Sequence, residues 1–138
     1  MKLVVILLLS VSISLAGCKS TDTSDAIRPE NAKNHLDSEV QVCGKVTSTE
    51  FASTSKNKPT FINMEKANPD HDFTIVIWGD TREILGYAPD VLLDQMEVCV
   101  TGEVELHEGK PQLVVNHPRQ ILIPRLQTKA SMERVYGT

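Results

Sequence analysis

Cysteine is the residue type in this chain that carries the clearest chemical signal, and the sequence holds three cysteines. Cys18 directly follows an apolar run, whereas Cys43 and Cys99 fall in segments where apolar and polar residues alternate. A thiol can be acylated, joined in a disulfide or buried unmodified, and its surroundings decide between these fates. An odd number of cysteines therefore raises the question of which one stands apart.

The segment before Cys18 has the features of a targeting signal. Lys2 supplies a positive start, residues 3–15 form an apolar stretch, and small residues precede the cysteine. At about 1.5 Å per residue, this stretch is too short to cross a ~30 Å hydrocarbon core comfortably. Residues 1–17 are therefore predicted to be a signal peptide; an ordinary secretory signal with an incidental cysteine is the alternative.

Residues 15–18, "LAGC", resemble the lipobox of bacterial lipoproteins. The resemblance implies that Cys18 is acylated and becomes the first residue after cleavage, which anchors the protein to a membrane. Two or more acyl chains make a stable anchor, whereas one is marginal. Lys19, rather than Asp, follows the cysteine. In that family this favours the outer membrane, facing the periplasm, if the cell has two membranes. Residues 18–28 are predicted to be a flexible, polar tether.

Charge is distributed unevenly along the chain, whose formal net charge is −4. Residues 21–118 hold 8 basic and 17 acidic side chains, a balance of −9, whereas residues 119–138 hold four basic and one acidic. The folded part is therefore predicted to be acidic, with a polar, mildly basic C-terminal tail over residues 124–138. An acidic surface disfavours a nucleic acid as the ligand, because contacts with phosphates dominate that affinity.

A period-two pattern predicts an all-β domain over residues 29–123. The expected strands cover residues 40–46, 60–65, 73–79, 97–106 and 111–116, and a short helix is expected over 29–36. Between the third and fourth strands, Gly86 and Pro89 limit any helix to one or two short turns. Five strands with this helical insert are the order of an OB-fold, a five-stranded Greek-key barrel that binds oligonucleotides and oligosaccharides.

Several segments carry a more specific likeness. The stretches "PENAKNHLDSEVQVCGKV", "PTFIN", "FTIVIWGD" and "VCVTGEVELHEGKPQLVV" resemble a bacterial family of small OB-fold domains, found in exported lipoproteins or beside secreted nuclease modules. The resemblance covers about residues 27–123 and implies the OB fold of a nucleic-acid-binding-like domain. Barrels of this kind host many functions, so the fold alone assigns none.

The OB topology makes a prediction about Cys43 and Cys99. In that fold the first and fourth strands are antiparallel neighbours, and both cysteines alternate with valines that are expected to face the core. Two residues directly opposite each other in such a pair lie within disulfide reach. A Cys43–Cys99 disulfide is therefore predicted, and two separate buried thiols are the alternative.

The ligand surface of an OB barrel lies on its second and third strands and the adjoining loops. The residues of this chain that fall there are the candidate ligand-binding residues Phe61, Asn63, Glu65, Phe73, Ile75, Trp78, Asp80 and Arg82. For the aromatic residues Phe61, Phe73 and Trp78, burial in the barrel core is the favoured interpretation and ligand contact is the alternative. No catalytic residues, cofactor or metal site are predicted: Asp70, His71 and Asp72 are adjacent in one turn, and three adjacent side chains rarely converge on one ion.

Two hypotheses of function follow. The first is a non-enzymatic, lipid-anchored binding or adaptor module of the bacterial cell envelope, whose acidic barrel engages a protein, a peptide or another envelope ligand. The second is an accessory protein that binds single-stranded DNA or RNA, as the family resemblance implies. The acidic charge and the anchor favour the first hypothesis.

Overall fold

The computed structural model describes residues 25–127 of the chain. Its elements in chain order are the 3-10 helix η2 (Pro29–His35), β1 (Glu39–Phe51), β2 (Thr60–Met64), β3 (Phe73–Ile77), α1 (Gly79–Leu85), α2 (Pro89–Leu92), β4 (Glu97–Glu103), β5 (Glu105–His107), β6 (Lys110–Val115), the 3-10 helix η3 (Pro118–Gln120) and β7 (Ile121–Leu122). The predicted signal peptide, Cys18, the start of the predicted tether and most of the predicted tail lie outside the described residues.

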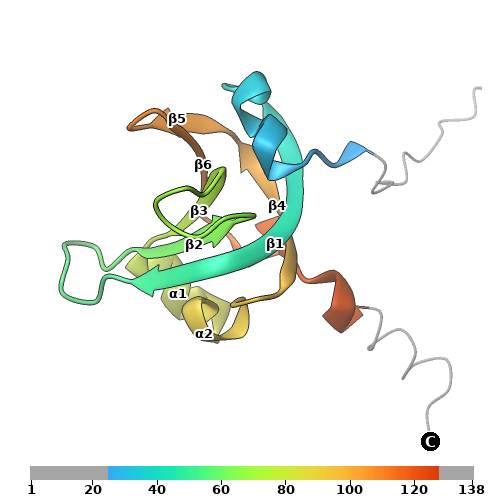
Figure 1. Cartoon of the computed structure of the whole chain (residues 1–138). Helices are drawn as coiled ribbons and strands as arrows, with labels where there is room; N and C mark the ends of the chain where they lie inside the picture. Colours follow the sequence, from blue (N-terminus) through green and yellow to red (C-terminus); the bar gives the residue numbers. More distant parts are fainter. Residues whose placement is uncertain (1–24, 128–138) are drawn as a thin grey trace, which may run out of the picture.

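Seven strands form one sheet in the order β5-β6-β3-β2-β1-β4-β7 (Figure 1). The long strand β1 pairs antiparallel with β4 through its first half and with β2 through its second half. β2 pairs antiparallel with β3, and β3 pairs in parallel with β6. Only Val104 separates β4 from β5, so one stretch of chain supplies strands near both ends of this order.

The chain is β-rich, as predicted, although its strands are divided differently. The single strand expected over residues 97–106 is present as β4 and β5, and the short β7 joins the sheet beside β4. Val104, between β4 and β5, is hydrogen-bonded to the segment before β1. The Val104 N–H donates to the carbonyl of Ser38, and the Val104 carbonyl accepts from the N–H of Asp37. The other expected strands are present, and β1 extends to Phe51.

The core gathers apolar side chains from all the longer strands. Val42 and Val46 of β1 are fully buried and flanked by more exposed residues, as the period-two pattern predicts, whereas in β4 the intervening Cys99 is buried together with Val98 and Val100. Every residue of β3 is buried. Removing each such aliphatic side chain from water is worth about 1.5–3 kcal/mol, so these strands supply most of the driving force for folding.

Two short helices occupy the predicted insert between β3 and β4. α1 ends at Gly86, whose left-handed φ of 73° suits glycine, and Pro89 begins α2. Gly79 lies against the loop between β1 and β2, because its N–H donates to the carbonyl of Asn57 at 2.9 Å. Within residues 25–127, no helix has the length and apolar character needed to cross a membrane.

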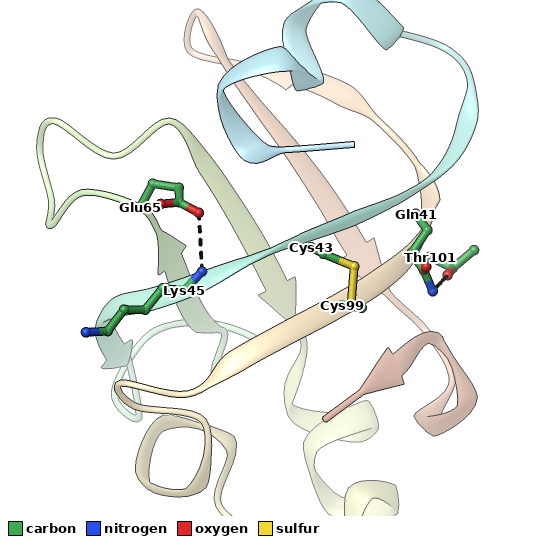
Figure 2. The surroundings of a disulfide bond; sticks show 6 residues. All are labelled: Gln41, Cys43, Lys45, Glu65, Cys99 and Thr101. Atoms are coloured by element: carbon green, nitrogen blue, oxygen red, sulfur yellow. Dashed lines mark hydrogen bonds between the residues drawn. A yellow bond between two sulfur atoms is a disulfide. The ribbon is translucent and has the colours of Figure 1, made fainter. Parts of the chain in front are cut away.

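Cys43 and Cys99 are directly opposite each other in the β1–β4 register and form a disulfide (Figure 2). Their Cα atoms are 4.0 Å apart and the S–S distance is 2.01 Å. On the same face of the strand pair, the Gln41 side-chain amide donates to the hydroxyl of Thr101 at 3.4 Å. The predicted disulfide is confirmed, and the alternative of two separate thiols is wrong.

The folded domain begins before the predicted end of the tether. The N–H of Ile27 donates to the carbonyl of Gln41 at 2.8 Å, and its carbonyl accepts from Cys43 N–H at 3.0 Å. Arg28 then forms an ion pair with Glu65 at 2.8 Å. These contacts secure the chain just before η2 along the disulfide-bearing part of β1.

Candidate ligand-binding face

A hollow of about 340 Å³ lies over β2, β3 and β6 on the side away from the core. Strand alternation positions its residues, because Ile62 and Met64 of β2 are buried in the core while Phe61 and Asn63 line the hollow. The full lining consists of Glu50, Phe61, Asn63, Asn68, Pro69, His71, Thr74, His107, Glu108, Lys110, Pro111 and Gln112. Its size falls within the range of about 300–1,000 Å³ typical of small-ligand sites.

The floor of this hollow is a set of polar side chains joined by hydrogen bonds. The hydroxyl of Thr74 donates to Asn63 Oδ1 at 3.0 Å, and Asn63 Nδ2 donates to Ser48 Oγ at 3.1 Å. The same Ser48 oxygen accepts from the N–H of Asn68 at 3.2 Å. Asn63 is 6% exposed and Thr74 is 8% exposed. Because buried polar groups need partners, this network fixes the orientation of the Asn63 amide.

One wall of the hollow is the loop between β2 and β3, and Lys110 holds it in place. The ammonium of Lys110 donates to the carbonyl oxygen of Pro69 and, at 3.4 Å, to that of His71. Lys110 is the first residue of β6, which pairs with β3. The wall is therefore attached to β6 through this cation and to β1 through the bond from Asn68 N–H to Ser48, rather than through strand pairing.

His71 lies in this wall with its imidazole partly buried. Burial lowers the pKa of His71 below its usual value, and the charge of Lys110 lowers it further, while Asp72 and Asp70 act in the opposite direction. The imidazole is therefore neutral at pH 7. Its Nδ1 is buried and has no hydrogen-bond partner among residues 25–127.

Two carboxylates stand at the edge of the hollow. Glu50 of β1 is directly opposite Phe61 of β2 in the strand register, so their side chains share one face of the sheet. Glu108 lies in the turn between β5 and β6. Both residues are exposed, and within the described part of the chain neither carboxylate accepts a hydrogen bond or forms an ion pair.

The structure divides the predicted ligand-binding residues into separate groups. Phe61 and Asn63 are brought together in the hollow. Phe73 and Ile75 are fully buried instead, as part of the core cluster. Because every residue of β3 is buried, these two side chains contribute to stability and present no surface to a ligand.

Glu65, another predicted contact, is used by the fold itself. Its Oε1 accepts from the backbone N–H of Lys45 at 3.3 Å, as Figure 2 shows, and from Arg28 at 2.8 Å. Gly44 makes this approach possible, because a Cβ at that position would come within 2.6 Å of the same carboxylate oxygen. Glu65 therefore joins the end of β2 to β1 and to the segment before η2.

Trp78, Asp80 and Arg82 lie around the start of α1, and none of them lines the hollow. Trp78 and Asp80 are exposed. Arg82 is mostly buried, and its Nη1 donates to Asp90 Oδ1 at 2.5 Å and to the Thr60 hydroxyl at 3.0 Å. These bonds connect α1 with α2 and β2, which is a structural role.

A second, more open hollow of about 440 Å³ lies beside Arg82. The guanidinium of Arg82 is 3.8 Å from the centre of the Phe51 ring, a cation–π contact that packs the helix against β1. On the same surface, burial raises the pKa of Tyr87. Because its central cation is already paired with Asp90, this hollow is a weaker candidate for a ligand site than the one over β2, β3 and β6.

The hollow also contains residues that sequence reasoning did not single out as ligand contacts. Lys110 and Gln112 of β6 reach it because β3 and β6 pair in parallel, and such long-range pairing leaves no periodic signal in the sequence. The turn at residues 66–72 suggested at most a metal site. Within residues 25–127, no group of three or more His, Cys, Asp or Glu side chains is arranged to hold a metal ion.

Comparisons with known proteins assign no function. No family model matches the chain, and no curated protein matches it. A protein described as an aspartyl-tRNA synthetase from Leishmania major Friedlin aligns with a TM-score of 0.47 and 17% identity, over 83% of this chain and 22% of that protein. The OBody AM1L10, bound to hen egg-white lysozyme, aligns with a TM-score of 0.46 and 20% identity, over 66% of this chain and 82% of the OBody. Both likenesses are distant, and this chain spans only about a fifth of the synthetase's length.

Proposed function

We propose that the sheet is an OB-type barrel of five strands, in which β4 and β5 together make one strand and β7 is an addition. β1 pairs with both β2 and β4, β3 pairs in parallel with β6, and β6 pairs with β5. The series of paired strands runs from β4 through β1, β2, β3 and β6 to β5. Because only Val104 separates β4 from β5, its two ends belong to one continuous stretch of chain, and the sheet closes. The position of α1 and α2 between β3 and β4 also supports the proposal.

The function that we propose is non-enzymatic ligand binding by a module whose contact surface is the hollow over β2, β3 and β6. The observation that carries it is the construction of that hollow, where the half-buried Phe61 ring lies beside the fixed polar floor of Asn63 and Thr74. A concave surface with apolar contact area and a few oriented polar groups is typical of binding sites. OB barrels bind ligands on the corresponding strands.

The module is proposed to be anchored at the bacterial cell envelope by acylated Cys18, on an outer membrane facing the periplasm. Seven residues, 18–24, precede the described chain. At about 3.3–3.6 Å per extended residue they span at most roughly 25 Å, so the domain would work close to the bilayer. In Figure 1 the start of the described chain lies far from the loop between β1 and β2. The disulfide suits the oxidising compartment that this location implies.

The anchor is tested by Cys18→Ser in the full-length protein. The substitution should abolish incorporation of labelled palmitate and move the protein from the membrane fraction to the soluble fraction. Cys43→Ser together with Cys99→Ser is the matched control, since it removes cysteines but leaves the acylation site. Equal membrane association of the wild-type protein and Cys18→Ser would contradict the lipoprotein proposal.

The binding face is tested by titrating the Cys18→Ser protein with a basic peptide, an acidic peptide, oligothymidylate and a chitooligosaccharide. Amide chemical shifts in nuclear magnetic resonance spectra should change around the hollow for at least one of these ligands. Shift changes confined to other surfaces would contradict the proposed binding face. Tight oligothymidylate binding that weakens steeply with salt would favour the alternative, a single-stranded nucleic-acid-binding protein.

A further inference from the structure

We propose that the hollow over β2, β3 and β6 receives a basic side chain, lysine or arginine, from a partner polypeptide. The inference rests on the proposed binding function and names the chemistry of its ligand. It follows from the charged groups of the lining, because its one cation already bonds the protein itself while two carboxylates are free.

Four donor side chains of the lining, including its one cation, bond other protein groups, whereas Asn68, His71 and His107 make no side-chain hydrogen bond within residues 25–127. Lys110 donates to two carbonyls of the loop between β2 and β3. The side-chain amide of Gln112 donates to Glu105 at 2.6 Å, and the Asn63 amide and Thr74 hydroxyl donate within the floor. A phosphate or carboxylate group would therefore find no uncommitted ammonium or guanidinium there and would lie near two free carboxylates.

The carboxylates of the lining are not committed in this way. The carboxylates of Glu50 and Glu108 and the side-chain oxygen of Gln112 accept no hydrogen bond from any residue between 25 and 127. A guanidinium carries five N–H donors and an ammonium three, and neither has an acceptor. The free groups of the hollow and those of a basic side chain therefore complement each other.

The aromatic surface and the charge of the hollow also favour a basic side chain as the ligand. The Phe61 ring is half-buried and directly opposite Glu50, so a cation could contact the ring face and the carboxylate together. Lys110 is the one Lys or Arg among the described residues that line the hollow, and neutral His71 adds no further positive charge. Residues 21–118 carry a balance of −9, which attracts a basic segment at longer range.

The test uses a hexa-arginine peptide with blocked ends, a hexaglutamate peptide of the same design, and the Cys18→Ser protein. Glu50→Gln and Glu108→Gln each remove one charge from the hollow without a large change in shape. Glu103→Gln is the matched control, because it removes the same charge from an exposed position on β4 that lines neither hollow. Binding is measured by isothermal titration calorimetry at low and moderate salt.

Hexa-arginine should bind and hexaglutamate should not. Each hollow substitution should weaken hexa-arginine binding roughly two- to fivefold and the pair roughly tenfold, whereas the control should change it less than about twofold. Phe61→Leu should also weaken binding, because it removes the ring but keeps an apolar side chain. All variants should keep the same unfolding midpoint within error.

Three results would overturn the inference in distinguishable ways. If Glu103→Gln weakens binding as much as the hollow substitutions, the attraction belongs to the whole acidic surface and the proposed site is wrong. If oligothymidylate or the chitooligosaccharide changes the amide chemical shifts of the hollow and hexa-arginine does not, the proposed basic ligand is wrong. The proposed binding face would still hold. If no probe shifts those amides, both the inference and the proposed binding face fail.

Discussion

The two ends of the long strand β1 are stabilised by different kinds of interaction. Toward its start, a disulfide joins β1 to β4, and the segment before η2 adds backbone hydrogen bonds. Toward its end, β1 lies along the edge of the hollow. There, side-chain hydrogen bonds of Asn63 fix the polar floor, and those of Lys110 fix the loop between β2 and β3. A bound ligand can alter the second kind of contact, and acid can protonate His71 beside it, whereas neither acts on the disulfide or the backbone hydrogen bonds. The difference indicates a rigid half that supports an adjustable binding face.

Removal of the disulfide should cause the largest loss of stability. Cys43→Ala with Cys99→Ala, both in the Cys18→Ser protein, frees a loop whose ends are 56 residues apart. In the chain-entropy model this lowers the free energy of unfolding by about 3–4 kcal/mol. Urea unfolding measures it, and a reducing agent should have the same effect on the Cys18→Ser parent. A loss well below 1 kcal/mol would mean that the two ends of β1 do not differ in this way.

Disruption of the polar floor should have the next largest effect. Asn63→Ala removes the amide that bonds Ser48 and Thr74, and the buried Thr74 hydroxyl loses its acceptor, at a cost of about 1–3 kcal/mol. Asn116→Ala is the matched control, because Asn116 is exposed and its side chain makes no hydrogen bond within residues 25–127.

The network also predicts coupling between its members. Thr74→Val should cost less in the Asn63→Ala background than in the parent, since its partner is already gone. Unfolding free energies of the four proteins in this double-mutant cycle provide the measurement. Strict additivity would indicate that the floor is not a single network, and that the hollow resembles any other solvated face.

The half of the domain that holds the disulfide was predictable from the sequence because its signals are local. The alternation of Val42, Cys43 and Val46, repeated around Cys99, fixes which side chains share a face. One rule of topology, that the first and fourth strands are neighbours, was then enough to bring the two sulfur atoms together. Local periodicity and a single long-range pairing therefore carried this half of the fold.

The hollow was predicted only in part, because its contacts connect distant segments through polar side chains. Strand alternation placed Phe61 and Asn63 on the face that forms the hollow, and the mostly apolar sequence of β3 indicated that Phe73 could be internal, as it is. The bonds from Lys110 to the loop between β2 and β3 cross 39 to 41 residues of sequence. No pattern of residue types specifies such contacts before the strands are arranged.

The smallest expected effect is a pH dependence from His71, which lies on the adjustable side. Burial and Lys110 lower its pKa in the folded protein, against the opposing influence of Asp72 and Asp70, below the ordinary value of 6.5 that applies to the unfolded chain. As the pH falls through 6.5, the unfolded chain therefore binds a proton that the folded protein does not, and stability is lost until the folded-state pKa is reached.

Urea unfolding midpoints at pH values above and below this window measure that loss. His71→Gln should make the midpoint less sensitive to pH, whereas Lys110→Met should reduce the sensitivity without removing it, because burial is the larger cause of the lowered pKa. The variant without the disulfide should keep the pH dependence of its parent, since Cys43 and Cys99 do not titrate when bonded. If His71→Gln and the parent lose stability equally on acidification, the acid response lies elsewhere and the wall of the hollow is as inert to protons as the disulfide side.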